Sequence, residues 1–359
     1  MRTGVAHLPL HDGKAPPWLF QRMKSLSREV VLFIIDHYGA QEMLLRLSDP
    51  YWFQAFGCAL GFDWHSSGVT TTVCGAMKEG IRGMEHEIGF YIAGGKGKAS
   101  RKTPQEIEEI CDRRSIDGTR LIYASRMSAK VDSAAVQDGY QIYQHSFFFT
   151  EDGSWVVIQQ GMNEETRYAR RYHWLSQGVK DFVCEPHWAV CCDQRDGGLN
   201  LVALESEKTR QAITELSHEK PEFLMSEGKK VNELYLSEAH PVPSEGIRLE
   251  RVEKIFAQIC SRSPENFEQL LGLQGVGPRS LRALSLISEL IYGARPSFRD
   301  PARFSFAHGG KDGHPYPVDR KVYDQTIEVL KSAIEKARVG DKEKVGAIKR
   351  LAAFSKVVS

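Results

Sequence analysis

The sequence predicts an α+β protein with two domains: a mixed N-terminal domain that contains an antiparallel hairpin sheet, and an all-α C-terminal domain. Two observations predict this fold class. Apolar residues recur at helical spacing at first, change towards a period of two around residues 140–160, and return to helical spacing after residue 247. A segment with Pro241, Pro243 and Gly246 interrupts the pattern. We therefore expect domains over residues 1–236 and 247–359, joined by a linker over residues 237–246.

Composition and charge limit the function classes. The chain has 359 residues, 42% of them hydrophobic and 26% charged, which is typical of a globular protein with ample core. With 47 Lys and Arg against 46 Asp and Glu, any nucleic-acid surface must come from local clustering of charge. The seven cysteines lack zinc-finger spacing, which favours a reduced, intracellular protein with no structural metal. No segment has the pattern of a signal peptide or membrane span, so a cytoplasmic protein without a membrane partner is expected.

The N-terminal region is predicted to begin with helices over Pro17–Tyr38 and Ala40–Ser48, where apolar residues follow helical spacing. The aromatic stretch from Tyr51 to Gly57 is typical of packed core, and its alternative role is a stacking platform for a base. A polar turn containing His65, a candidate pocket residue, precedes a predicted helix over residues 71–82.

A basic, glycine-rich stretch follows at residues 92–102. It contains Lys96, Lys98 and Arg101, which we take as candidate DNA contacts because cations on a mobile loop can lie along a phosphate backbone. The alternative is a solvated surface loop. Thr103 and Pro104 then predict the start of a helix, with the threonine as its cap.

The strand pair is predicted over residues 140–149 and 155–160. Both segments are rich in aromatic and β-branched residues, and the loop between them contains the turn signal Asp152-Gly153.

Polar segments flank this hairpin on both sides. Residues 125–140 combine hydroxyls, cations and carboxylates, and residues 159–174 alternate arginines with aromatic rings on a predicted helix. Interleaved cations and rings suit phosphate contact and base stacking, although a surface helix with Glu–Arg pairs is the alternative. From these segments and the turn above, the candidate catalytic residues are Lys130, Asp132 and Asp138, and the candidate pocket residues are Arg126, Tyr140, Gln160, Asn163 and His65.

The C-terminal domain is organised around a predicted helical hairpin. After a helix starting near Ser263-Pro264, the stretch Leu273-Gln274-Gly275-Val276-Gly277 joins it to a second helix over residues 280–292. Glycines at 275 and 277 permit positive φ, and amides at the start of the second helix favour an anion such as a DNA phosphate. The candidate DNA contacts here are Gly275, Val276, Gly277, Arg279 and Ser280.

The hairpin together with the later Pro317-Val318-Asp319-Arg320-Lys321-Val322 resembles the helix-hairpin-helix DNA glycosylase superfamily. The resemblance implies that Asp319 is the catalytic carboxylate, and that Arg320 and Lys321 lie near DNA. Arg279 falls where bifunctional members have lysine, which implies a monofunctional enzyme because arginine does not form a Schiff base. Asp319 stands farther from the hairpin than the superfamily pattern expects, so residues 297–315 are interpreted as an insertion. A monovalent cation at the hairpin is a candidate partner.

Further blocks resemble a domain-of-unknown-function family, number 763, found in archaea and thermophilic bacteria. They are residues 130–134, 137–140, 160–163 and 297–301. This second resemblance covers nearly the full length. It implies removal of oxidised thymine such as 5-hydroxymethyluracil, and an N-terminal domain that helps to build the pocket.

The function expected from the sequence is therefore monofunctional DNA base excision, with double-stranded DNA carrying a modified pyrimidine as substrate and no cofactor. A carboxylate would stabilise the positive charge that develops on the sugar as the N-glycosidic bond breaks. Two alternatives stay open. One is a metal-dependent nuclease with Asp132, Asp138 and Glu164 as Mg²⁺ ligands and the hairpin as a clamp. The other is a non-enzymatic DNA-binding protein.

Overall fold

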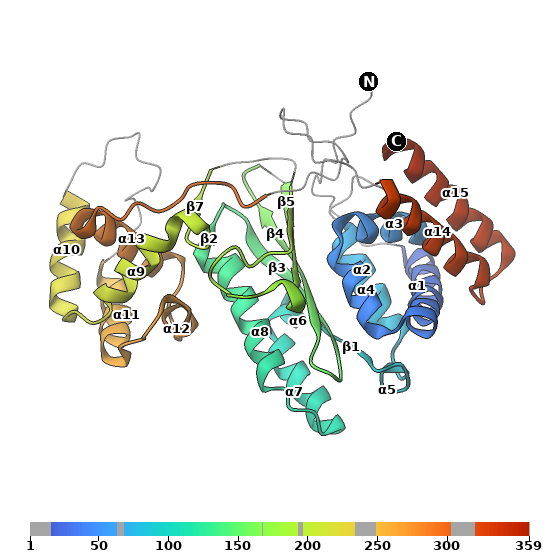
Figure 1. The fold of residues 1–359 in the computed structure, drawn as a ribbon, viewed down its shortest axis with the longest axis horizontal. Helices are drawn as coiled ribbons and strands as arrows, with labels where there is room; N and C mark the ends of the chain where they lie inside the picture. The colour runs from blue at the N-terminus through green and yellow to red at the C-terminus, as the bar shows by residue number, and fades with distance from the viewer. Residues whose placement is uncertain are drawn as a thin grey trace.

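A central antiparallel sheet separates two layers of helices (Figure 1). The computed structural model describes residues 16–62, 68–166, 168–192, 197–233, 249–302 and 320–358. Within these ranges the protein is mixed α+β, as the sequence predicts. The sheet has the order β1-β3-β4-β5-β6, and β2 pairs separately with β7. The strands are β1 (Phe90–Lys96), β2 (Val136–Gln137), β3 (Gln141–Thr150), β4 (Trp155–Asn163), β5 (Tyr168–Leu175), β6 (Ala189–Cys191) and β7 (Leu199–Asn200).

The predicted hairpin of β3 and β4 is confirmed. Phe147 pairs with Val157, and Asp152 closes the turn by accepting the amide of Ser154 at 3.1 Å. Both faces of the pair are buried, with Phe147 in one hydrophobic core and its neighbour Phe148 in the other. A strand that is covered on both sides needs apolar residues at successive positions, which explains the run of three phenylalanines.

The first helical layer contains both ends of the described chain. The predicted helices over Pro17–Tyr38 and Ala40–Ser48 are confirmed, and the aromatic stretch that follows them is buried, as its core interpretation requires. The layer consists of α1 (Pro17–Tyr38), α2 (Ala40–Ser48), α3 (Pro50–Leu60), α4 (Gly68–Gly80), α14 (Arg320–Lys336) and α15 (Asp341–Val358), with the short α5 (Glu85–Ile88) beside β1.

Helices α14 and α15 lie far from the helical hairpin in this arrangement. The sequence prediction grouped residues 320–358 with the hairpin, but α14 contacts α1 and α15 contacts α3. Leu330 and Ile334 of α14 share one core with Val30 and Ile34 of α1. An amphipathic pattern shows that a helix buries one face but does not identify the surface that covers it.

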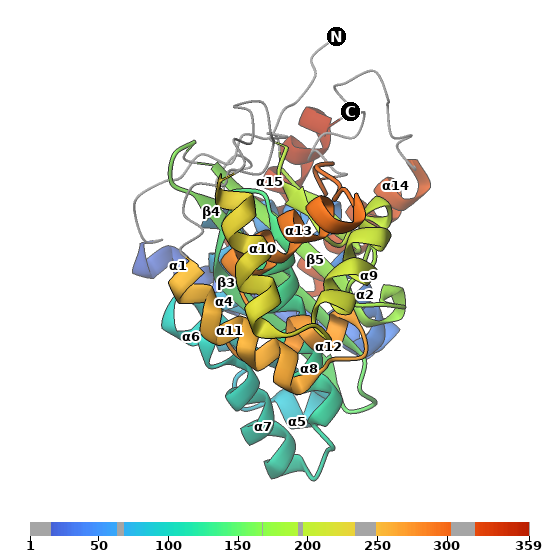
Figure 2. The same cartoon turned by 90° about the vertical axis from the view of Figure 1, so that its left-hand side faces the viewer.

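The second layer covers the opposite face of the sheet in two tiers. Helices α7 (Thr103–Arg114) and α8 (Thr119–Lys130) pack on the strands, and further helices pack outside them (Figure 2). These outer helices are α9 (Glu207–Leu216), α10 (Pro221–Glu233), α11 (Leu249–Arg262), α12 (Phe267–Gly272) and α13 (Pro278–Tyr292). The predicted linker over residues 237–246 lies outside the described residues. None of the described helices is long and apolar enough to span a bilayer.

Two local predictions are wrong. The segment with alternating arginines and rings is strand β5 rather than a helix, and Arg170 and Arg171 are fully buried on its two faces. Its period-two alternation suits a strand that pairs with β4 on one side and β6 on the other. The basic stretch is not an open loop, because it contains the end of β1 and the short helix α6 (Lys98–Arg101).

The expected helix caps also differ. Thr103 does not cap α7, because its hydroxyl donates to the carbonyl of Ser100 at 2.9 Å. The helix before the hairpin is capped by Asn266, whose side chain accepts the amide of Gln269 at 2.9 Å.

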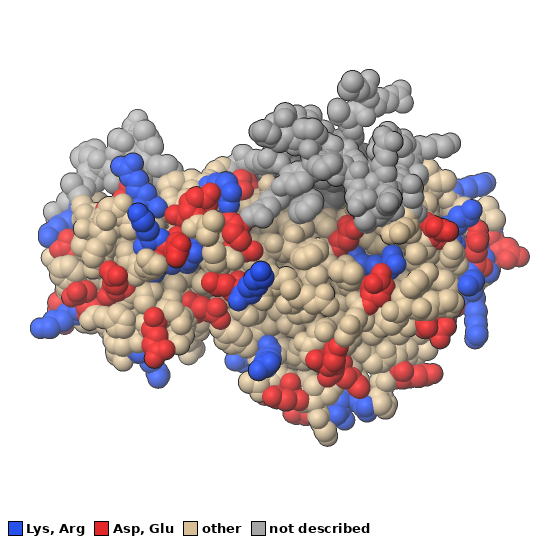
Figure 3. Space-filling view, viewed as in Figure 1, with Lys and Arg blue, Asp and Glu red and all other residues tan. Residues whose placement is uncertain are grey.

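Charge is interspersed on the face of the molecule shown in Figure 3, where Lys and Arg alternate with Asp and Glu.

Candidate functional site

A π-helical turn places a carboxylate inside the protein. Helix α8 ends at Lys130 and continues as a π-helix over Val131–Ala135, which contains Asp132. The side chain of Asp132 is fully buried between the turn and the sheet. Single π-turns are rare and occur frequently at functional sites, because the extra residue redirects side chains.

Asp132 accepts hydrogen bonds from three other parts of the chain. The donors are Gln159 Nε2 on β4, Trp174 Nε1 on β5 at 2.9 Å, and His187 Nε2 before β6 at 2.5 Å. A buried carboxylate requires such donors to offset the loss of its hydration. The site therefore exists only when β4, β5, the segment before β6 and the π-turn are assembled.

His187 connects Asp132 to a small pocket. Its side chain is 8% exposed, and its ring packs edge-on against Trp174 with centroids 4.7 Å apart. Among the described residues, Asp132 is the only hydrogen-bond partner of the ring. The pocket encloses about 10 Å³, which is room for a single water molecule. It is lined by His187, Glu185, Ala189, Val190, Asn200, Val202 and Pro301.

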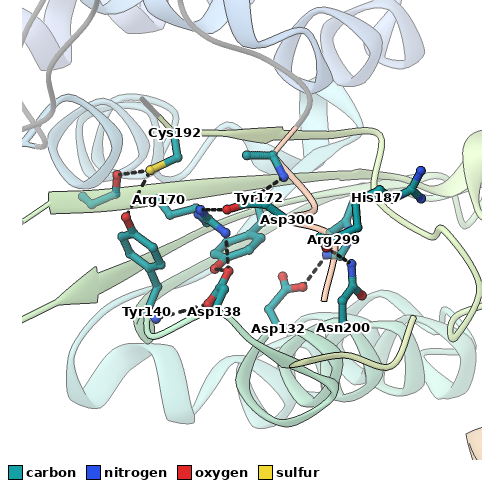
Figure 4. A network of polar contacts seen from close by, with 12 residues as sticks. Asp132, Asp138, Tyr140, Arg170, Tyr172, His187, Cys192, Asn200, Arg299 and Asp300 are labelled. Atoms are coloured by element: carbon teal, nitrogen blue, oxygen red, sulfur yellow. Dashed lines mark hydrogen bonds and ion pairs between the residues drawn. The ribbon is translucent and has the colours of Figure 1, made fainter. Parts of the chain in front are cut away.

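A second buried network surrounds Asp138 (Figure 4). The guanidinium of Arg170 donates to Asp138 and to Asp300, each at 2.7 Å, and Tyr172 Oη donates to Asp138 at 2.7 Å. Arg170 also lies over the ring of Tyr140, 4.4 Å from its centroid. Burial raises the pKa of the Asp300 carboxyl, while Arg170 acts in the opposite direction. This network ties the loop after α13 to the sheet.

A chain of neutral groups supports Asp132 from behind. Burial lowers the pKa of His145 to about 4, so its ring is neutral near pH 7. His145 Nδ1 donates to Gln159 Oε1 at 2.8 Å, and its Nε2 accepts from Ser125 Oγ at 2.9 Å. Gln159 can then donate to Asp132 only through its amide nitrogen. These bonds fix the orientation of the Gln159 amide and hold the carboxylate in place.

The helical hairpin is attached to the same π-turn. The Nζ of Lys130 donates to the carbonyl of Leu273, at 3.2 Å, and to that of Val276. Gln137 Nε2 donates to the carbonyl of Pro278 at 2.9 Å. Burial lowers the pKa of Lys130. The Lys130 ammonium thus fixes the turn between α12 and α13. Lys130 itself is only two residues before Asp132 in the chain.

The turn itself follows the sequence prediction in part. Gly275 has a φ of +86°, whereas Gly277 is extended at −152° and its amide donates to Ser280 Oγ at 3.0 Å. Val276 is buried, and Arg279 is exposed. A positive φ is therefore needed at only one of the two glycines.

The other predicted residues do not gather around Asp132. Lys96, Lys98 and Arg101 are exposed at the end of β1 and on α6, and Arg126 is exposed on α8. Gln160 is buried and donates to Tyr143, whereas the Asn163 side chain accepts two amides of its own turn. The predictions for His65, Asp319 and the side chains of Arg320 and Lys321 lie outside the described residues.

The proposed magnesium ligands do not converge. Asp132 and Asp138 have separate partners, and Glu164 is exposed at the end of β4. No group of three or more His, Cys, Asp or Glu side chains in the described ranges is placed to hold a metal ion.

Sequence reasoning missed His187, although it predicted Asp132. The histidine lies in a stretch without a chemical motif, between residues 175 and 235. Its role depends on contacts with β4, β5 and the π-turn, which no local pattern in the sequence reveals.

A family model described as "Protein of unknown function (DUF763)" matches residues 4–318. The chain belongs to this family. The DUF763 match includes the whole sheet, the π-turn and the helical hairpin, and it ends before α14. No curated protein and no solved structure matches the chain.

Proposed function

We propose that the protein is a monofunctional DNA glycosylase of base-excision repair, which hydrolyses the N-glycosidic bond of a modified pyrimidine such as 5-hydroxymethyluracil. The observation that carries this proposal is the exposed turn between α12 and α13, which Lys130 fixes beside a buried carboxylate. A backbone grip for DNA and a buried carboxylate thus lie close together in the fold.

The turn has the features of a phosphate contact. The first amides of α13 have no acceptor within the helix, and the helix dipole favours an anion at this end. Gly275 is exposed and has no side chain to block the approach of a phosphate. Arg279, exposed in the first turn of α13, adds a cation at the same position.

The proposed chemistry assigns a role to one carboxylate, Asp319, and excludes Arg279 and Lys130 as nucleophiles. Asp319 would stabilise the positive charge that develops on the sugar as the base leaves. The base must first be extruded from the duplex, which costs least for a damaged or mispaired base. Arg279 cannot act as the amine nucleophile, and the Lys130 amine is bonded to two carbonyls. Both features support hydrolysis without strand cleavage.

The function is tested with duplex oligonucleotides that each carry one modified base, incubated with the protein in EDTA. We expect alkali-labile abasic sites on duplexes with an oxidised thymine, and no strand breaks before alkali. Asp319→Asn should abolish base release while leaving duplex binding unchanged. Strand cleavage that EDTA abolishes would favour the nuclease alternative. Tight, salt-sensitive binding without turnover on any base would favour a binding protein.

The DNA contact is tested separately with Arg279→Ala. We expect weaker duplex binding and a slope of log affinity against log salt that is shallower by about 1, because one phosphate contact is lost. Arg113→Ala is the matched control, since Arg113 is exposed on α7, away from the hairpin. Equal affinity and equal salt slope for the two variants would contradict a DNA contact at Arg279.

A further inference from the structure

The hydrogen bond between Asp132 and His187 has a defined donor and acceptor. A carboxylate accepts hydrogen bonds only, so the proton between Asp132 Oδ1 and His187 Nε2 belongs to the ring nitrogen. In the neutral ring, Nδ1 then carries a lone pair. No described residue donates to this lone pair.

We infer that Asp132 and His187 form a catalytic dyad, in which His187 Nδ1 is the general base for the water that attacks the sugar. This inference rests on the hydrolytic function proposed above and identifies a second site within it. The best-known use of a buried aspartate behind a histidine is to fix the tautomer and to stabilise the imidazolium that forms.

The surroundings of Asp132 suit this role. The carboxylate keeps two further donors, Gln159 Nε2 and Trp174 Nε1, and the Gln159 amide is oriented by neutral His145. Gln159, Trp174 and His145 are all buried in the core, where close packing restricts their movement. A fixed environment lowers the reorganisation needed for proton transfer.

The pocket beside His187 matches the size of the proposed reactant. It has room for one water but not for a nucleobase, so an extruded nucleotide would lie outside it. Its polar rim is fixed by Arg299, which donates to Glu185 at 2.5 Å and whose carbonyl accepts from Asn200 at 2.9 Å. Figure 4 shows His187, Asn200 and Arg299 close together on this side of Asp132.

The step balances as hydrolysis. His187 Nδ1 takes one proton from water while the water oxygen bonds to C1′ of the sugar. The C1′–N bond breaks, and its electron pair stays on the ring nitrogen of the departing base. The base then takes up one proton, and His187 returns to its neutral form. The products are a free base and an abasic sugar with a hydroxyl at C1′.

The first test is His187→Gln, because a glutamine amide can still donate to Asp132 but cannot accept a proton from water. We expect base release to slow by about 10²- to 10⁴-fold, with duplex affinity within about twofold of wild type. His86→Gln is the control, since His86 is exposed on α5. Asp132→Asn should slow release as well, because the imidazolium loses its counter-charge.

Chemical rescue distinguishes a base from a structural residue. In His187→Ala, added imidazoles should restore base release, and the restored rate should rise with the basicity of the imidazole. A rate that is restored equally by all imidazoles, or not at all in a variant that still binds duplex, would overturn the dyad.

A measurement on the unliganded wild-type protein tests the geometry without turnover. Nitrogen chemical shifts of His187 should report a proton on Nε2 and none on Nδ1 in the singly protonated ring. A proton on Nδ1 would overturn the dyad whatever the activity. Wild-type protein that releases no base would overturn the proposed function and the dyad together. Wild-type activity with an equally active His187→Gln variant would overturn the dyad alone.

Discussion

At the scale of residues, two adjacent buried arginines on β5 are stabilised by different kinds of partner. Arg170 donates to the carboxylates of Asp138 and Asp300, so its charge is balanced within the core. Arg171, on the other face, donates to neutral His173 at 2.9 Å and to Gln54 at 3.2 Å. Burial lowers the pKa of Arg171 to about 10, which still leaves it charged near pH 7. Ion pairing and neutral hydrogen bonds thus hold the two sides of one strand.

Buried neutral histidines make the fold sensitive to acid. Burial lowers the pKa of His145 from 6.5 to about 4 and also lowers that of His173. Between pH 6.5 and about pH 4, His145 binds a proton in the unfolded chain but not in the folded protein. The free energy of unfolding therefore falls as the pH falls through this range. The loss should reach about 3 kcal/mol for His145.

Urea unfolding at about pH 7 and about pH 4.5 measures this loss. His145→Gln should reduce the stability difference between the two pH values, because glutamine does not titrate. His86→Gln, on the surface, should leave the difference unchanged. An undiminished pH dependence in His145→Gln would show that this ring is not the source.

At the scale of elements, the helical hairpin depends on one backbone conformation. Gly275 has a φ of +86°, and a Cβ placed there would lie 2.7 Å from Ile255 Cδ1. The Lys130 ammonium can bond two carbonyls of the turn only if the turn keeps this path. The shape of the turn and its attachment to the π-turn are therefore coupled.

Gly275→Ala should distort the turn and weaken binding to unmodified duplex by at least about tenfold, as measured by fluorescence anisotropy. Gly293→Ala is the matched control. Gly293 also has a positive φ, +63°, but ends α13 in open space with nothing within 4 Å of a Cβ. Gly293→Ala therefore introduces backbone strain at a positive φ without disturbing the turn between α12 and α13. Equal loss of binding in both variants would argue against the hairpin as the DNA contact.

At the scale of the whole molecule, the sheet separates two helical layers that contain different parts of the chain. One layer joins α1–α4 to α14 and α15, and the other carries the π-turn and the hairpin. The pair of Asp132 and His187 and the DNA contact at the hairpin both lie on the side of the second layer. The first layer supports the other face of the sheet, so a cavity in the core of that layer should affect function only through stability.

Leu330→Ala tests this separation, because Leu330 is fully buried where α14 meets α1. We expect a loss of about 2–5 kcal/mol in stability and faster hydrogen exchange in α1. Base release by the folded protein should not change. Leu290→Ala, at a position 41% exposed on α13, is the control and should cost little. Unchanged exchange in α1 would contradict the packing of α14 on it.

Local patterns predicted the elements whose signals lie within a few residues. The bounds of α1 and α2 and the β3–β4 hairpin were predictable from periodicity and turn chemistry. Strand β5 was not, because arginines spaced among aromatic rings fit an exposed helix as well as a strand with two buried cations. Burial of Arg170 depends on Asp138 and Asp300, and burial of Arg171 depends on Gln54, all of which are distant in the chain.

The sequence by itself determined the α+β class and the glycine turn between two helices. Tertiary structure decided which side chains meet. It brought His187 to Asp132, Lys130 to the hairpin carbonyls, and α14 to α1. Turns and periodicities arise from interactions between near neighbours, whereas these contacts form only when distant segments share one core.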